Sequence, residues 1–190
     1  MHHYIEEDLK TTKMNTQALY QRSIMFAGEK HKNQLVPGTN SNYLLHLSNV
    51  AMEILIASQY TKNFDLNFSV QVALLHDILE DTETEFTDLE SEFGFPIADA
   101  VYALTKKAHF PKEQQMVDSL NRIKKLQPEV WAVKLADRIT NLQPPPIHWD
   151  TEKKKNYLGQ AKLILKELKY GNDYLAKRLE NKIIEYKNYL

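Results

Sequence analysis

Apolar residues recur at helical spacing in several long segments of this 190-residue chain. The spacing predicts helices over residues 16–32, 43–60 and 66–79. The third of these segments is nearly apolar along much of its length and should therefore lie at the centre of the molecule. No long run alternates as a strand would, so the pattern predicts an all-α fold in a single domain without internal repeats.

Prolines mark where further helices begin and end. Proline suits the first turn of a helix, so we expect helices to begin at Pro96, Pro111 and Pro128. The three prolines at 144–146 should end the last of these, since proline cannot continue the backbone hydrogen-bond ladder. The polar segment 106–115 is predicted to be a mobile loop.

Capping residues refine the boundaries. Thr87 and Glu90 fit a capping box, and Gly94 is a plausible end for that short helix. Asp150 and Asn172 could each cap a later helix, the second running to the C-terminus. We therefore expect an N-terminal tail (1–14), a helical domain (15–171) and a C-terminal helix packed on the same domain (172–190).

Composition narrows the function classes. Hydrophobic residues make up 43% of the chain and charged residues 26%, with a net charge of -1, so no basic nucleic-acid footprint is evident. No apolar run reaches the roughly 20 residues of a membrane span, and the acidic start is unlike a signal peptide, so we expect a cytoplasmic protein. Cysteine is absent, so any bound metal must use histidine and carboxylate ligands.

The most informative stretch is residues 72–82, an apolar run that ends in a cluster of ionisable groups. If it is one continuous helix, His76 lies beneath Glu80 and Asp77 beneath Asp81. Three carboxyl groups in a small volume repel one another unless a positive charge lies among them, and a divalent cation is the simplest resident. The alternative is a helix end whose polar residues face water. This alternative explains Glu80 and Asp81 better than it explains His76 and Asp77.

Two more helices carry residues that could complete a metal site. His46 lies early in the second predicted helix, and Asp137 follows an apolar helical stretch. Alone, each has an ordinary explanation: His46 as a core histidine, and Asp137 as the ion-pair partner of Arg138 or a neighbouring lysine. Together, two imidazoles and two carboxylates form a set suited to manganese, iron or zinc.

The order His46, His76-Asp77, Asp137 resembles that of the HD phosphohydrolase superfamily. The HD-x-x-E-D motif at 76–81 and the K-L-A-D-R-x-x-N motif at 134–141 resemble the hydrolase domain of the RelA/SpoT group. More closely, the chain resembles the stand-alone small alarmone hydrolases, and this resemblance covers roughly residues 17–168. The resemblance implies an HD-type helical bundle and assigns residues 15–171 to an HD hydrolase domain.

The resemblance also implies an activity, which is removal of the 3′-pyrophosphate from guanosine tetra- or pentaphosphate with manganese as the usual metal. It implies a metal-ligand set of His46, His76, Asp77 and Asp137. Glu80 and Asp81 match the catalytic acidic pair. We assign Glu80 to orienting or deprotonating the attacking water and Asp81 to holding its partners, although either carboxylate could serve as base.

Substrate contacts are expected from Arg138, Asn141, Lys153 and Tyr157. A cation near the distal phosphates is required because the substrate carries so much negative charge. Each assignment has an alternative. Arg138 could pair only with a carboxylate, the lysine run at Lys153 could be a solvated face, and Tyr157 could belong to the core.

The sequence departs from the family near the first ligand. His31 and Gln34 resemble the family's His-x-x-Gln, but Val36 and Pro37 stand where relatives carry an Arg-Lys pair that helps hold the nucleotide. The base is therefore open, and an adenosine counterpart is an alternative. So are an HD enzyme acting on another nucleotide phosphoester, and a binding module with a degenerate site. The expected partner is a small nucleotide, and the sequence leaves open whether the chain forms a homo-oligomer.

Overall fold

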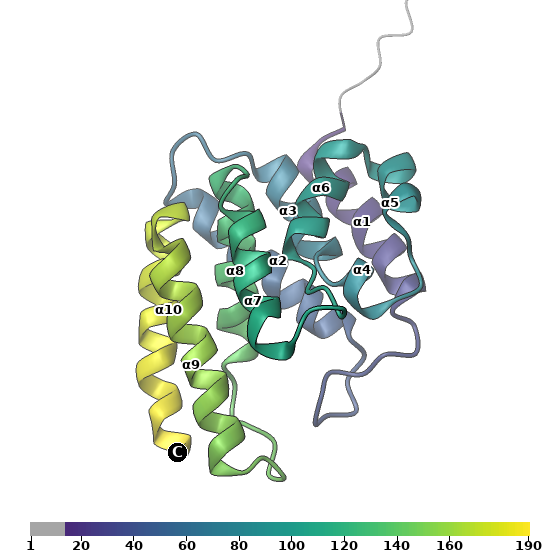
Figure 1. The fold of residues 1–190 in the computed structure, drawn as a ribbon. Coiled ribbons are helices and arrows are strands. Elements are labelled where there is room, and N and C mark those ends of the chain that lie inside the picture. Colours follow the sequence, from purple (N-terminus) through teal and green to yellow (C-terminus); the bar gives the residue numbers. More distant parts are fainter. Residues whose placement is uncertain (1–13) are drawn as a thin grey trace, which may run out of the picture.

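The computed structural model describes residues 14–190, and within that range the fold is all-α, as predicted (Figure 1). The helices are α1 (Thr16–Lys30), α2 (Leu44–Gln59), α3 (Leu66–Leu75), α4 (Ile78–Asp81), α5 (Phe86–Phe93), α6 (Phe95–Leu104), α7 (Lys112–Ile123), α8 (Pro128–Asn141), α9 (Thr151–Leu168), η1 (Lys169–Gly171), α10 (Asp173–Tyr186) and η2 (Lys187–Tyr189). Between α1 and α2, an isolated antiparallel bridge joins Leu35 to Asn42.

Helices α2, α3 and α8 form the centre of the bundle. Helix α3 packs against α1, α2, α6 and α8, and its side chains Leu74 and Leu75 are fully buried, as its apolar sequence predicts. Helices α9 and α10 form a hairpin along one edge of the molecule, while α5 and α6 lie on the opposite side (Figure 1). This arrangement brings the ends of α2, α3 and α8 to one place.

Most of the predicted helix boundaries are confirmed. The Asp150 side chain accepts from the Lys153 N–H, and the Asn172 side chain accepts from the Leu175 N–H, so both residues cap helices as expected. Helices begin at or next to each of the three prolines. Gly94 ends α5 with a φ of 83°, a left-handed conformation that glycine adopts without strain.

The prediction of one helix over 66–79 is wrong. Helix α3 ends at Leu75, the chain turns at His76 and Asp77, and α4 begins at Ile78. The His76 ring donates from Nδ1 to the Ala73 carbonyl at 2.8 Å, taking the acceptor that the Asp77 N–H would use in a continuous helix. His76 and Glu80 are therefore not stacked one turn apart on a single helix.

Two other boundaries differ from the sequence prediction. The capping box of α5 uses Glu85 and Asp88 in place of Thr87 and Glu90. The helix starts earlier because Phe86 packs against the core and contacts the rings of Phe95 and Tyr102. The predicted loop 106–115 is shorter, since α7 already begins at Lys112.

The C-terminal helix α10 packs on α2, α8 and α9. The division of the chain at residues 14 and 171 stays a prediction, and residues 1–13 of the proposed tail lie outside the described part. No helix within residues 14–190 combines the length and apolar character needed to cross a membrane.

Candidate metal centre

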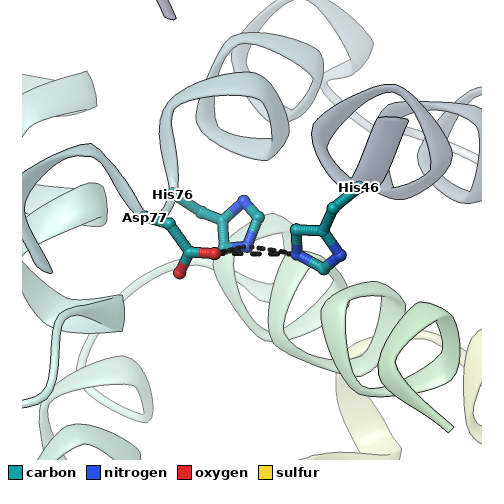
Figure 2. Close-up of side chains that lie close together, drawn as sticks. All are labelled: His46, His76 and Asp77. Atoms are coloured by element: carbon teal, nitrogen blue, oxygen red, sulfur yellow. Dashed lines mark hydrogen bonds and ion pairs between the residues drawn. The ribbon is translucent and has the colours of Figure 1, made fainter. Parts of the chain in front are cut away.

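The three residues His46, His76 and Asp77 converge from α2 and the α3–α4 turn (Figure 2). The His76 Nε2 lies 2.9 Å from Asp77 Oδ2 and 3.3 Å from His46 Nε2. The His46 Nε2 lies 3.6 Å from the same Asp77 oxygen. Both imidazoles are almost completely buried.

Asp137, at the end of α8, joins this cluster. Its Oδ1 lies 3.5 Å from His46 Nε2 and 3.7 Å from His76 Nε2. The donor atoms of His46, His76 and Asp77 all lie within 4.8 Å of one another, and Asp137 Oδ1 lies next to both imidazoles. Adjacent ligands about 2.1 Å from a common ion are roughly 3 Å apart, so the three donors have the spacing of one coordination shell and Asp137 borders it. The structure thus brings together all four of the predicted metal ligands.

The hydrogen bonds of the histidines prepare them for a metal. Because the Ala73 carbonyl can only accept, the His76 Nδ1 must carry a proton, so Nε2 is the nitrogen that faces the cluster and can bind a metal once its own proton leaves. The Thr140 hydroxyl lies 3.3 Å from His46 Nδ1 and donates to the Asp137 carbonyl. The residues present therefore fit a divalent metal ion, with His46, His76 and Asp77 as its core.

The ionisable groups of the cluster strongly shift one another's pKa values. Burial lowers the pKa of His76, but Asp77 and Asp137 outweigh this effect and raise it to about 10. Burial lowers the pKa of His46, but the hydrogen bonds that its ring donates to the same carboxylates outweigh this effect and raise it. Burial raises the pKa of Asp77, but the two imidazoles hold it well below the usual range. In the protein without metal, protons thus partly take the place of a cation.

Partners outside the cluster orient the two carboxylates. Asp137 Oδ2 accepts from Lys134 Nζ at 2.9 Å, and Asp137 Oδ1 accepts from the Asn141 side chain. The ion-pair alternative for Asp137 is thus realised by Lys134, one turn earlier on α8. The Tyr43 hydroxyl donates to Asp77 Oδ2 at 2.5 Å.

The acidic pair lies in α4, beside the cluster. Glu80 Oε2 accepts from the Lys106 backbone N–H at 2.8 Å, and Glu80 Oε1 pairs with the Lys106 ammonium. Asp81 Oδ2 accepts from the Gln34 amide at 2.8 Å, and Gln34 in turn contacts the buried His31. Burial raises the pKa of Asp81, with Asp77 and Glu80 adding to the effect and Gln34 opposing it.

A cleft of about 410 Å³ opens onto these groups. Its acidic lining residues are Asp77, Glu80, Asp81 and Asp137. Its basic lining residues are Lys106, Lys112, Lys134 and Arg138. The two sets together make a polar cleft in which an anionic substrate could approach a metal ion.

The predicted substrate contacts divide into two groups. Arg138, Asn141 and Tyr157 line the cleft. Arg138 is only 4% exposed, its guanidinium lies 4.6 Å from the centre of the Tyr157 ring, and its Nε and Nη1 have no hydrogen-bond partner among the described residues. Lys153 is exposed with its ammonium 4.5 Å from the Trp149 ring centre, and it lies outside the lining of the cleft.

A second cavity of about 430 Å³ adjoins the cleft and shares Asn141 and Tyr157 with it. Val36 and Pro37 line it, together with the three prolines at 144–146 and Trp149. No lysine, arginine, aspartate or glutamate is among its lining residues. A charged polar cleft next to an uncharged, partly aromatic cavity suits a ligand with an anionic end and a flat neutral end.

Sequence analysis assigned no contact at the site to three residues that reach it, whereas Lys134 is the neighbouring lysine that it offered as a partner of Asp137. Tyr43 and Gln34 reach the carboxylates from a loop, and Lys106 was assigned to a mobile segment. No periodic pattern could have indicated these three, because tertiary packing brings them to the site.

An all-helical bundle with clustered histidines and aspartates that fit a divalent metal is the arrangement of an HD-type protein. The family model for the HD domain matches residues 23–159, which is most of the chain. The chain therefore belongs to the HD domain family.

The chain is similar in sequence to two pyrophosphohydrolases. The guanosine-3′,5′-bis(diphosphate) 3′-pyrophosphohydrolase MESH1 of Danio rerio is 30% identical over 173 residues, covering 88% of this chain and 94% of the relative. A guanosine-3′,5′-bis(diphosphate) 3′-pyrophosphohydrolase of Spiroplasma citri is 32% identical over 130 residues, covering 65% of this chain and 16% of that much longer protein.

A solved structure is similar in fold. It is described as a metazoan ortholog of SpoT that hydrolyzes ppGpp and plays a role in starvation responses. The two structures superpose with a TM-score of 0.78 at 25% sequence identity, covering 95% of this chain and all of that one. The helices that carry the cluster are thus part of a shared architecture.

Proposed function

We propose that this protein is a metal-dependent 3′-pyrophosphohydrolase of guanosine 3′,5′-bis(diphosphate) and related alarmone nucleotides. The observation that carries the proposal is the convergence of four imidazole and carboxylate donors beside an acidic pair in a cleft with basic walls. The names of the relatives that align along nearly the whole chain support the same activity.

We assign His46, His76, Asp77 and Asp137 as the ligands of one divalent ion, and manganese as that ion. Mixed imidazole and carboxylate donors suit manganese, and no thiolate is available to favour a softer metal. Such an ion supplies Lewis-acid polarisation of a phosphoryl oxygen and lowers the pKa of bound water.

Glu80 is the proposed general base and water-orienting residue. Its carboxylate lines the cleft together with Asp77 and Asp137, and the Lys106 backbone N–H fixes one of its oxygens. Asp81 is held by Gln34 and supports the arrangement next to it. A base needs to lie within one hydrogen bond of the water that it deprotonates, and α4 directs both carboxylates into the cleft.

Arg138 is the proposed phosphate contact. Its guanidinium lines the cleft, and its buried Nε and Nη1 have no hydrogen-bond partner among the described residues, so a shift of the side chain towards the cleft would let phosphate oxygens satisfy them. The Asn141 side chain donates a hydrogen bond to Asp137, so its proposed role is to orient this metal-binding carboxylate. The structure gives Lys153 no contact with the cleft, and its proposed substrate contact would require the side chain to leave Trp149.

The uncharged second cavity is the proposed place of the nucleoside. Tyr157 and Trp149 offer aromatic surface to a base, and Asn49 and Gln143 offer amide groups at its edge. None of the lining residues carries a charge that would select guanine over adenine. The adenosine counterpart of the substrate therefore belongs in any test.

A product-release assay tests the proposal. Purified protein is incubated with the guanosine and adenosine 3′-pyrophosphates, with and without manganese, and with a chelator. Release of pyrophosphate that requires metal is expected, and the matched variant Asp77→Asn should release none. Release of inorganic phosphate alone would indicate an HD phosphatase acting on another phosphoester. No turnover of any nucleotide would overturn the proposal.

A further inference from the structure

The Lys106 side chain lies between the proposed base and the open cleft. Its backbone N–H and its ammonium bind different oxygens of the Glu80 carboxylate. The side chains of both residues are partly exposed and line the cleft that also contains Asp77, Asp137 and Arg138. The ammonium is therefore positioned where an anionic substrate would enter.

The backbone around Lys106 is anchored independently of its side chain. The Arg122 guanidinium donates to the Thr105 carbonyl at 2.6 Å. Ser119 is buried and its hydroxyl donates to the carbonyls of Ala103 and Leu104 at 2.9 and 3.1 Å. Helix α7 thus fixes the end of α6, so the bond from the Lys106 N–H to Glu80 persists wherever the ammonium points.

The two hydrogen bonds have opposite consequences for a base. The backbone bond orients Glu80, whereas the ammonium occupies the oxygen that would otherwise accept a proton from water. Burial lowers the pKa of Lys106, but Glu80 outweighs this effect and raises it, so the side chain is a cation. A nucleotide pyrophosphate carries several negative charges and competes with a single carboxylate for that cation.

Resting on the proposed function, we propose that Lys106 binds the substrate pyrophosphate and that its transfer from Glu80 to phosphate releases the base. In the empty enzyme the ammonium pairs with Glu80. In the complex it binds a phosphate oxygen, and Glu80 stays oriented by the Lys106 N–H alone. The base is then available only when substrate is present.

The test is a double-mutant cycle with inorganic pyrophosphate as the probe, titrated calorimetrically into the metal-loaded protein. Lys106→Met removes the ammonium and keeps the backbone N–H, and it should weaken pyrophosphate binding about ten- to a hundredfold. Lys106→Arg should retain most of the affinity. The control is Lys107→Met, because the Lys107 ammonium lies over the Tyr102 ring outside the cleft lining and its loss should change nothing.

The cycle distinguishes transfer from a fixed ion pair. If the ammonium leaves Glu80, Glu80→Gln tightens pyrophosphate binding more in the parent than in the Lys106→Met background. Equal or smaller tightening in the parent would overturn the proposal, as would an unchanged affinity in Lys106→Met. Lys106→Gln serves as the second variant should Lys106→Met fail to fold, which its thermal unfolding curve reveals.

A structure of the metal-loaded protein with pyrophosphate provides the direct check. The proposal expects the Lys106 ammonium within hydrogen-bond distance of a phosphate oxygen, and an ammonium still paired with Glu80 contradicts it. Neither measurement requires turnover. Failure of the nucleotide assay would therefore refute the proposed activity alone, and failure here would refute only the role of Lys106.

Discussion

The side chains of the site have two roles: some offer donor atoms to a metal, and others orient those donors. His46, His76 and Asp77 present donor atoms to one small volume, and Tyr43 and the Ala73 carbonyl orient them from outside. The sequence predicted the donors because their order resembles that of the HD superfamily, whereas His46 alone has an ordinary explanation as a core histidine. It could not predict the orienting partners, since Tyr43 and Ala73 are ordinary residues whose role depends on the folded geometry.

The role of Glu80 can be separated from metal binding. Glu80→Gln keeps the shape and can still accept from the Lys106 N–H, but it cannot take a proton. We expect turnover to fall roughly 10²- to 10⁴-fold, with manganese affinity nearly unchanged. Steady-state kinetics and metal titration measure the two effects. A Glu80→Gln protein as active as the parent would refute the assignment of the base.

Metal affinity should depend on pH. In the metal-free protein the pKa of His76 is about 10, so near neutrality an incoming ion must displace its proton. Affinity should therefore rise with pH by about tenfold per unit for each proton released, and this rise should end near pH 10. Calorimetric manganese titrations in buffers of different ionisation enthalpy measure how many protons are released when the metal binds. An affinity independent of pH would show that His76 is not a ligand.

Helix boundaries were the most predictable elements, because caps and prolines act locally. Asp150, Asn172 and Gly94 mark the boundaries expected of them. The break between α3 and α4 was not predictable, because the apolar pattern continues across it. The bond from His76 to the Ala73 carbonyl interrupts the ladder, and it becomes visible only when the site is assembled.

The contact between η1 and α8 sets the position of the helix that carries Asp137. Gly171 packs so closely on α8 that a Cβ would overlap Trp131. Gly171→Ala should therefore lower the free energy of unfolding by about 1–3 kcal/mol through overpacking. Chemical denaturation measures this change.

The matched control is Gly159→Ala in α9, where a Cβ would meet nothing within 4 Å. Alanine in a helix interior is more favourable than glycine, so this variant should gain about 0.5–1 kcal/mol. If both substitutions had the same effect, the close packing of η1 on α8 would not be a determinant of stability.

Across the molecule, a partly buried ion pair connects the C-terminal helix to the centre of the bundle. The Glu53 side chain in α2 is 3% exposed and accepts two bonds of 2.6 Å from Arg178 in α10. Arg178→Met would leave this carboxylate buried without a partner. We expect a loss of about 2–3 kcal/mol, below the range for a fully buried pair because the Arg178 side chain is 40% exposed.

The control is Lys177→Met on the same helix, whose ion pair with Glu180 is largely exposed. Thermal unfolding should show a lower midpoint for Arg178→Met and no shift for Lys177→Met. Equal midpoints would mean that α10 is not held through Glu53. The sequence alone did not indicate this pair, because its two residues are 125 positions apart.

The proposed activity depends on one ion that binds four side chains from separated helices. Anomalous diffraction from a crystal of the manganese-loaded protein would locate that ion. We expect a single peak within about 2.3 Å of donor atoms from His46, His76, Asp77 and Asp137. A peak elsewhere, or one that lacks His46 or Asp137 in its shell, would contradict it.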